Sequence, residues 1–132
     1  MDTSEKYIKM CREGFKDLGV PQIYYGTIMY PILWATKNLM GEFVLLRQGI
    51  QPTSGKWWPI YRQDQLQEMA NTKWPWPMYL FRFYEFIQQE YLYNAEEWKP
   101  IADYSMEQLW LAFVMKEKFG KTWDDEKGEM IS

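Results

Sequence analysis

The large number of aromatic side chains is the feature that most constrains how this chain can fold. The sequence contains 8 Trp, 10 Tyr and 7 Phe, which together make up 19% of its residues. Each such side chain buries about 150–250 Å² when it is packed. One core in a chain of 132 residues has limited room for them, so we expect some rings to lie at the surface. These rings either cover the rim of a crowded core or form a recognition patch.

The length and the charge balance indicate a single folded domain. A chain of 132 residues has the size of one domain, and 47% hydrophobic with 25% charged residues is the composition of a globular protein. We expect this domain to span residues 1–123. Residues 124–132 are polar and are predicted to form a frayed C-terminal tail.

Helical periodicity and capping residues predict about four helices. Residues 64–67 and 105–108 both have the sequence of a capping box, in which a polar side chain caps the helix and a Gln three residues later reaches back. Gly120 is expected to end the last helix. The predicted helices cover about residues 5–18, 64–71, 78–93 and 106–119.

Three segments between the first two predicted helices are typical of β-strands, namely residues 23–36, 42–48 and 56–61. Pro59 confines the last segment to a sheet edge, because proline has no N–H to donate. Residues 37–41 form a plausible turn between the other two. The order of the elements predicts an α+β fold, with a small antiparallel sheet of two or three strands packed against about four helices.

The absence of histidine and the single cysteine exclude several classes of chemistry. No catalytic triad or dyad that uses imidazole as its base can be built from this chain, and neither can a histidine or four-cysteine zinc site. Cys11 lies on the apolar stripe of the first predicted helix, where a free cysteine behaves as a small hydrophobic residue. No glycine-rich phosphate loop is present. We therefore predict no cofactor, no metal and no catalytic residue.

Carboxylates are the one catalytic resource that the composition leaves open. Glu85 with Glu90, Glu96 with Glu97, and the acids at 124–126 are available for a carboxylate-only hydrolase. Their order in the chain does not support such a site, and solvated helix faces explain them better. The sequence thus favours a protein that is not an enzyme.

Basic and aromatic residues alternate in three places, and these define the candidate interaction surface. Aromatic and arginine side chains dominate the hot spots of protein interfaces. The residues of the candidate surface are Trp57, Trp58, Tyr61, Arg62, Trp74, Trp76 and Arg82.

Binding of another protein is the function that this surface favours. Single-stranded nucleic acid is an alternative, because bases stack on aromatic rings, but the net charge of −3 disfavours it. A small ligand in an aromatic pocket is a further alternative. Residues 23–30 are apolar on both faces when extended, which leaves self-association open.

The N-terminal residues lack a basic region followed by an apolar run, and no segment is apolar enough for a membrane helix. Together with the single cysteine, this predicts a cytoplasmic protein in a bacterial host cell. Residues 1–11, 62–69 (RQDQLQEM) and 105–120 (SMEQLWLAFVMKEKFG) resemble small uncharacterised proteins encoded in phages and prophages of Gram-positive bacteria. That family has no assigned activity. The resemblance implies a phage-related accessory protein that acts on a host or phage protein, for example by inhibiting a host factor.

Overall fold

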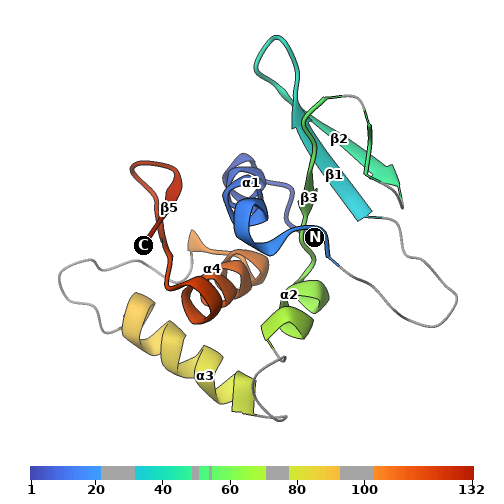
Figure 1. The fold of residues 1–132 in the computed structure, drawn as a ribbon. Helices are drawn as coiled ribbons and strands as arrows, with labels where there is room; N and C mark the ends of the chain where they lie inside the picture. The colour runs from blue at the N-terminus through green and yellow to red at the C-terminus, as the bar shows by residue number, and fades with distance from the viewer. Residues whose placement is uncertain (22–31, 49–50, 54, 71–77, 93–102) are drawn as a thin grey trace, which may run out of the picture.

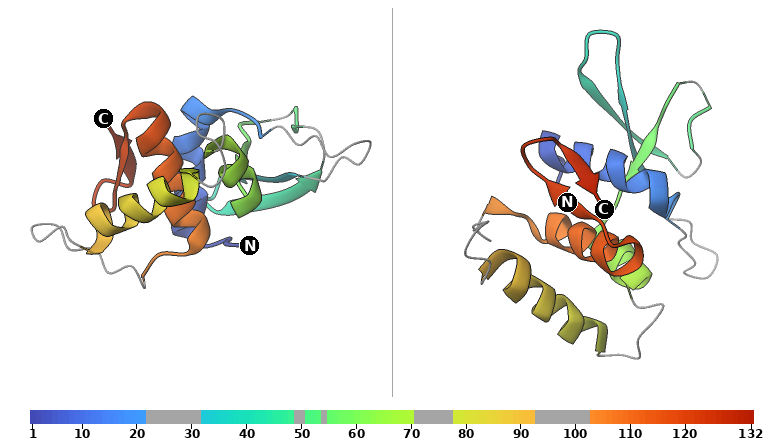
Figure 2. Two further views of the ribbon diagram at one scale, coloured as in Figure 1. Left: turned by 90° about the horizontal axis from the view of Figure 1, so that it is seen from below. Right: turned by 60° about the vertical axis from the view of Figure 1, so that its left-hand side comes forward.

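Helix α4 (Met106–Phe119) lies at the centre of the fold because it is apolar around most of its circumference. All eight residues from Gln108 to Met115 are buried, as expected for a helix that is covered on every side. Helices α1 (Glu5–Leu18), α2 (Gln63–Ala70) and α3 (Met78–Ile87) all pack on it. In Figures 1 and 2, α4 lies between α1 and α3.

The computed structural model describes residues 1–21, 32–48, 51–53, 55–70, 78–92 and 103–132. The remaining elements of these residues are β1 (Ile32–Lys37), β2 (Phe43–Gln48), β3 (Trp58–Ile60), a π-helical turn η1 (Gln88–Leu92), β4 (Thr122–Asp124) and β5 (Glu129–Ile131). The four helices, the three-stranded antiparallel sheet and the two-stranded hairpin confirm the predicted α+β class.

The three-stranded sheet has the order β2-β1-β3, and all its pairs are antiparallel. The expected position of Pro59 at an edge is confirmed, since β3 is an outer strand. One face of β3 packs on α1, where the Trp58 indole Nε1 donates a hydrogen bond of 3.0 Å to the Ile8 carbonyl. The far end of the β1–β2 hairpin extends away from the helices (Figures 1 and 2).

Capping residues lie at the ends of both α1 and α4, and those of α4 are the predicted ones. Ser4 Oγ accepts a hydrogen bond from the Tyr7 N–H at 3.2 Å. Ser105 and Gln108 form the predicted capping box, and Gly120 ends α4 in the left-handed conformation. Gly14 permits α1 and α4 to approach closely, because a Cβ atom there would lie 3.2 Å from the Leu111 side chain.

Several predicted element boundaries were wrong. The strand predicted at residues 56–61 spans only Trp58–Ile60. Helix α2 begins at Gln63, where the side chain of Gln65 accepts from the Arg62 N–H at 2.8 Å, so Asp64 does not take the capping position. The third predicted helix ends at Ile87 and continues as the wider turn η1. That turn places Tyr91 edge-on against Phe86 and Tyr104.

The predicted frayed tail is instead a β-hairpin in which β4 pairs with β5. Trp123 is buried and anchors the first strand. Asp124 Oδ1 accepts from the backbone N–H groups of Glu126 and Lys127, and Gly128 closes the turn with a positive φ of 66°. The hairpin also contacts α1, so the chain remains ordered beyond Trp123.

Candidate interaction surface

Two residues of the predicted surface belong to the core. Trp58 is 6% exposed and Tyr61 is fully buried. The Tyr61 hydroxyl donates to the Gly19 carbonyl at 2.6 Å, and the Tyr61 carbonyl accepts from the Tyr7 hydroxyl at 2.6 Å. These side chains therefore join β3 to α1, and neither ring is available to a partner.

The other predicted residues do not gather into one patch. Trp57 and Arg62 are half-buried, and Arg62 forms an ion pair with Asp64 at 3.0 Å. Arg82 belongs to α3, which α4 separates from β3 in both figures. Trp74 and Trp76 lie outside the described residues.

The outer face of α3 is the most exposed aromatic surface on the described helices. Phe81 is 63% and Tyr84 59% exposed, and Met78 lies one helical turn before Phe81. The opposite face of the same helix is buried, where the Phe83 ring stacks on Trp110 with the ring centroids 3.8 Å apart. We call Met78, Phe81 and Tyr84 the outer α3 face.

Polar side chains border the outer α3 face. The Arg82 guanidinium lies 3.3 Å from the Glu85 carboxylate and 3.1 Å from the Glu117 carboxylate of α4. The Gln88 amide donates to the Tyr84 hydroxyl at 2.7 Å, which orients the exposed ring. An aromatic centre with a polar rim is the usual composition of a protein interface. The spacing of 78, 81 and 84 is visible in the sequence, and it could have identified this face.

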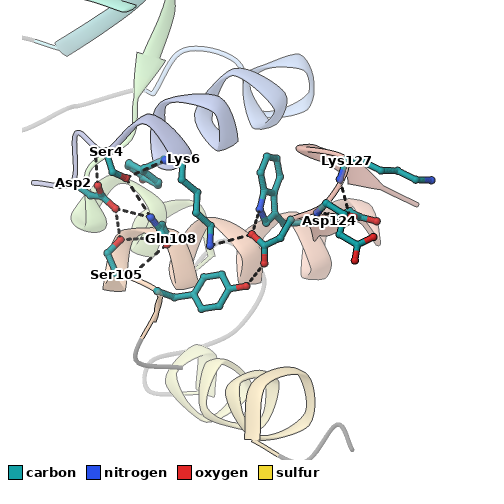
Figure 3. A network of polar contacts seen from close by, with 12 residues as sticks. Asp2, Ser4, Lys6, Ser105, Gln108, Asp124 and Lys127 are labelled. Atoms are coloured by element: carbon teal, nitrogen blue, oxygen red, sulfur yellow. Dashed lines mark hydrogen bonds and ion pairs between the residues drawn. The ribbon is translucent and has the colours of Figure 1, made fainter. Parts of the chain in front are cut away.

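Two carboxylates, of the half-buried Asp2 and the exposed Asp125, form a second group of polar residues, but their contacts are structural (Figure 3). The Asp2 carboxylate accepts from Ser105 Oγ at 2.6 Å and from Gln108 Nε2 at 2.9 Å, which ties the N-terminus to the start of α4. The Asp125 carboxylate accepts from Lys6 Nζ at 3.0 Å, and from the Trp123 indole and the Tyr104 hydroxyl.

These contacts set the direction of the pKa of both acids. Burial alone would raise the pKa of Asp2 and of Asp125, but the hydrogen bonds to each carboxylate outweigh it. The net effect holds both pKa values below the ordinary value of 3.8. Both groups are therefore ionised at neutral pH.

We expect the free energy of unfolding to fall as the pH drops below about 4, because the unfolded state binds protons before the folded state does. The stabilisation by Asp2 and Asp125 is complete at pH values above the pKa of these groups in the unfolded chain. It is lost as the pH falls through their lower pKa in the folded protein. Denaturant unfolding between about pH 6 and pH 3 measures this loss. Asp2→Asn should flatten the profile, and an unchanged slope in that variant would contradict the assignment.

Metal-ligating residues and the single cysteine are the remaining candidates for reactive chemistry. Within the part of the chain that the structure describes, no three His, Cys, Asp or Glu residues gather where they could hold a metal ion. Burial raises the pKa of Cys11 to about 12, so this thiol stays protonated. None of the described helices is long and apolar enough to cross a membrane.

Comparison of the chain with models of protein families, with curated proteins and with solved structures finds no match.

Proposed function

We propose that the chain is a non-enzymatic accessory protein, phage-related as the sequence resemblance implies, that acts by binding another protein through the outer α3 face. The observation that carries the proposal is the exposure of Phe81 and Tyr84 on a helix whose opposite face is built into the core. Large apolar side chains that are exposed together on a folded surface often mark a contact with a partner. A partner supplies the cover that is absent from the described residues.

The outer α3 face is well suited to binding because its anchors are held in place before a partner arrives. Stacking of Phe83 on Trp110 fixes the rotation of α3, and Gln88 orients the ring of Tyr84. Anchors that are already ordered lose little conformational entropy on association. Most of the gain from removing the two exposed rings from water therefore contributes to affinity.

The spacing of the anchors indicates the shape of the partner. Side chains at 78, 81 and 84 project from successive turns of one helix, which is the arrangement that fits into an apolar groove. The ion pair of Arg82 with Glu85 lies beside the anchors and matches a polar rim on the partner. An occupied groove is blocked to its usual ligand, which is how such a protein would inhibit a host factor.

Single-strand nucleic-acid binding receives less support from the geometry. That alternative depends on bases stacking on the aromatic residues at 57–61 and on Trp74 and Trp76. Trp58 and Tyr61 are buried, Trp57 is half-buried, and Trp74 and Trp76 lie outside the described residues. No observation on the described residues favours a small-ligand pocket.

The double variant Phe81→Ser/Tyr84→Ser is expected to lose the partner while the fold is retained. Aromatic hot spots contribute about 2 kcal/mol or more each, so the affinity should fall by roughly a hundredfold or more. Affinity capture from a lysate of a Gram-positive host, followed by titration of each captured protein against both chains, measures the loss.

The matched control for that experiment is Leu39→Ser/Met40→Ser, which removes two exposed apolar side chains from the β1–β2 turn. It should leave the titration unchanged. The proposal fails if the α3 variant binds the same protein as tightly as the parent chain, or if the parent chain captures none.

A further inference from the structure

The two edges of the three-stranded sheet differ in how they are protected. The β3 edge is three residues long and contains Pro59, which cannot donate a hydrogen bond to an added strand. The β2 edge is six residues long, with the sequence FVLLRQ, and has neither proline nor lysine. β2 pairs only with β1 among the described residues, and within that part of the chain its other edge is open.

The register of the sheet shows which backbone groups point out of the open edge. Pro59 lies opposite Trp34 and has no N–H, so the backbone groups of Trp34 face β2 at Leu46. The Asn38 N–H also donates to the Glu42 carbonyl at 2.9 Å, so here too the even-numbered residues of the hairpin bond to one another. Because the direction alternates along a strand, the N–H and C=O groups of the odd-numbered residues point outward, which are Phe43, Leu45 and Arg47.

Apolar side chains lie on both faces of β2 and are only partly covered, since the Phe43 ring at one end of the strand packs edge-on against Trp58. Val44, Leu45 and Leu46 are 40%, 40% and 39% exposed, although successive side chains point to opposite faces of the sheet. Strands that are apolar on both faces normally lie inside a sheet with both faces packed. Arg47 is also exposed, and its guanidinium forms no ion pair within the described ranges.

We propose that β2 of one copy pairs with β2 of a second copy, antiparallel about a two-fold axis at Leu45, to form a continuous six-stranded sheet. Leu45 then faces Leu45 of the second copy, and the outward backbone groups of both strands are paired. Both copies use the same patch, as a two-fold interface requires.

The side chains that would face one another across two copies of β2 are complementary, which favours a second copy of this chain as the partner of the open edge. In the proposed register Phe43 of each copy faces Arg47 of the other. Each of these two symmetric pairs places a guanidinium beside an aromatic ring. Val44 faces Leu46 on the other face of the sheet. This register therefore gives each side chain from 43 to 47 a suitable neighbour.

The neighbouring registers are less favourable. If the strand of the second copy slides along β2, the outward-pointing backbone groups still face one another only when it moves by two residues. A shift in one direction places the Glu42 carboxylate opposite Leu46. A shift in the other direction places Gln48 opposite Val44 and shortens the paired segment. The apolar residues 23–30, which the sequence singled out for self-association, lie outside the described residues.

A charge-exchange experiment tests the proposed axis. The parent chain should show a dimer by analytical ultracentrifugation as its concentration is raised. Leu45→Lys places two ammonium groups opposite one another and should weaken the dimer at least tenfold, and Leu45→Glu should do the same. An equimolar mixture of the two variants should recover association, because each Lys then faces a Glu.

Two controls separate this interface from the outer α3 face. Leu39→Lys carries the same charge at the exposed turn and should dimerise like the parent chain. Phe81→Ser/Tyr84→Ser should also dimerise like the parent chain. Dimerisation through β2 is therefore tested independently of partner binding through the outer α3 face. The inference is overturned if the parent chain stays monomeric, if Leu45→Lys dimerises unchanged, or if the mixture of charge variants does not associate.

Discussion

Replacing Trp110 with alanine is expected to lower the free energy of unfolding by about 3–5 kcal/mol, the range found when a large aromatic side chain is removed from a core. Trp110 is 1% exposed and connects α4 with α3. Its ring stacks on Phe83 at 3.8 Å and meets Phe113 edge-on at 5.8 Å. The truncation leaves a cavity between α3 and α4 that neither helix can fill without moving.

Denaturant unfolding followed by circular dichroism measures this loss. Phe81→Ala is the matched control, because it removes an aromatic ring from the exposed side of the same helix pair and should change stability by no more than about 0.5 kcal/mol. Trp110→Phe should cost less than Trp110→Ala, since the Trp110 Nε1 has no hydrogen-bond partner to lose among the described residues. Equal costs for Trp110→Ala and Phe81→Ala would show that the ring is not part of the core.

Elements whose signals are local could be predicted from the sequence. The capping box of Ser105 and Gln108 and the terminal Gly120 act within one turn of α4, so their residues alone fix the ends of that helix. Pro59 acts in the same way, because its missing N–H excludes it from the interior of a sheet whatever surrounds it.

Where a local signal conflicts with the packing of the core, the core decides. Near α2 the sequence predicts a cap at Asp64 with Gln67, whereas in the structure the helix begins at Gln63 and the Gln65 side chain accepts from the Arg62 N–H. Leu66 is fully buried in the resulting helix, and α2 packs on α4. That contact joins residues far apart in the chain, so no local pattern could have predicted the residue at which α2 begins.

The candidate surface was harder to predict because exposure is a property of the whole fold. A tryptophan beside a basic residue has the same local sequence whether it is a stacking platform or a core residue. Trp58 and Tyr61 are buried because Ile8 and Gly19 supply carbonyls to their polar atoms from more than 40 residues away. Phe81 has a similar local sequence and is exposed.

The rings that the sequence identified as too numerous for one core divide accordingly. Most described aromatic residues are buried, and the largest group packs between α3 and α4. Phe81 and Tyr84 remain outside because α3 has a second side that α4 cannot reach. The composition predicted an excess of rings, whereas their location depended on which helix face met α4.

Cys11 is expected to react with a thiol reagent at least about a thousandfold more slowly in the native protein than in the unfolded chain. The side chain is fully buried, and burial raises the pKa of the thiol to about 12, so the native state offers neither access nor thiolate. Labelling with iodoacetamide, followed by mass spectrometry with and without denaturant, measures the ratio.

The Trp110→Ala variant shows whether labelling reports opening of the whole core. Cys11 and Trp110 belong to one hydrophobic cluster, so the opening that exposes the thiol should be the global one. A loss of about 3–5 kcal/mol then increases the labelling rate by roughly two to four powers of ten, since 1.4 kcal/mol corresponds to a factor of ten. Phe81→Ala should leave the rate unchanged. If the parent chain is labelled rapidly and neither substitution changes the rate, α1 instead opens locally while α3 and α4 remain packed.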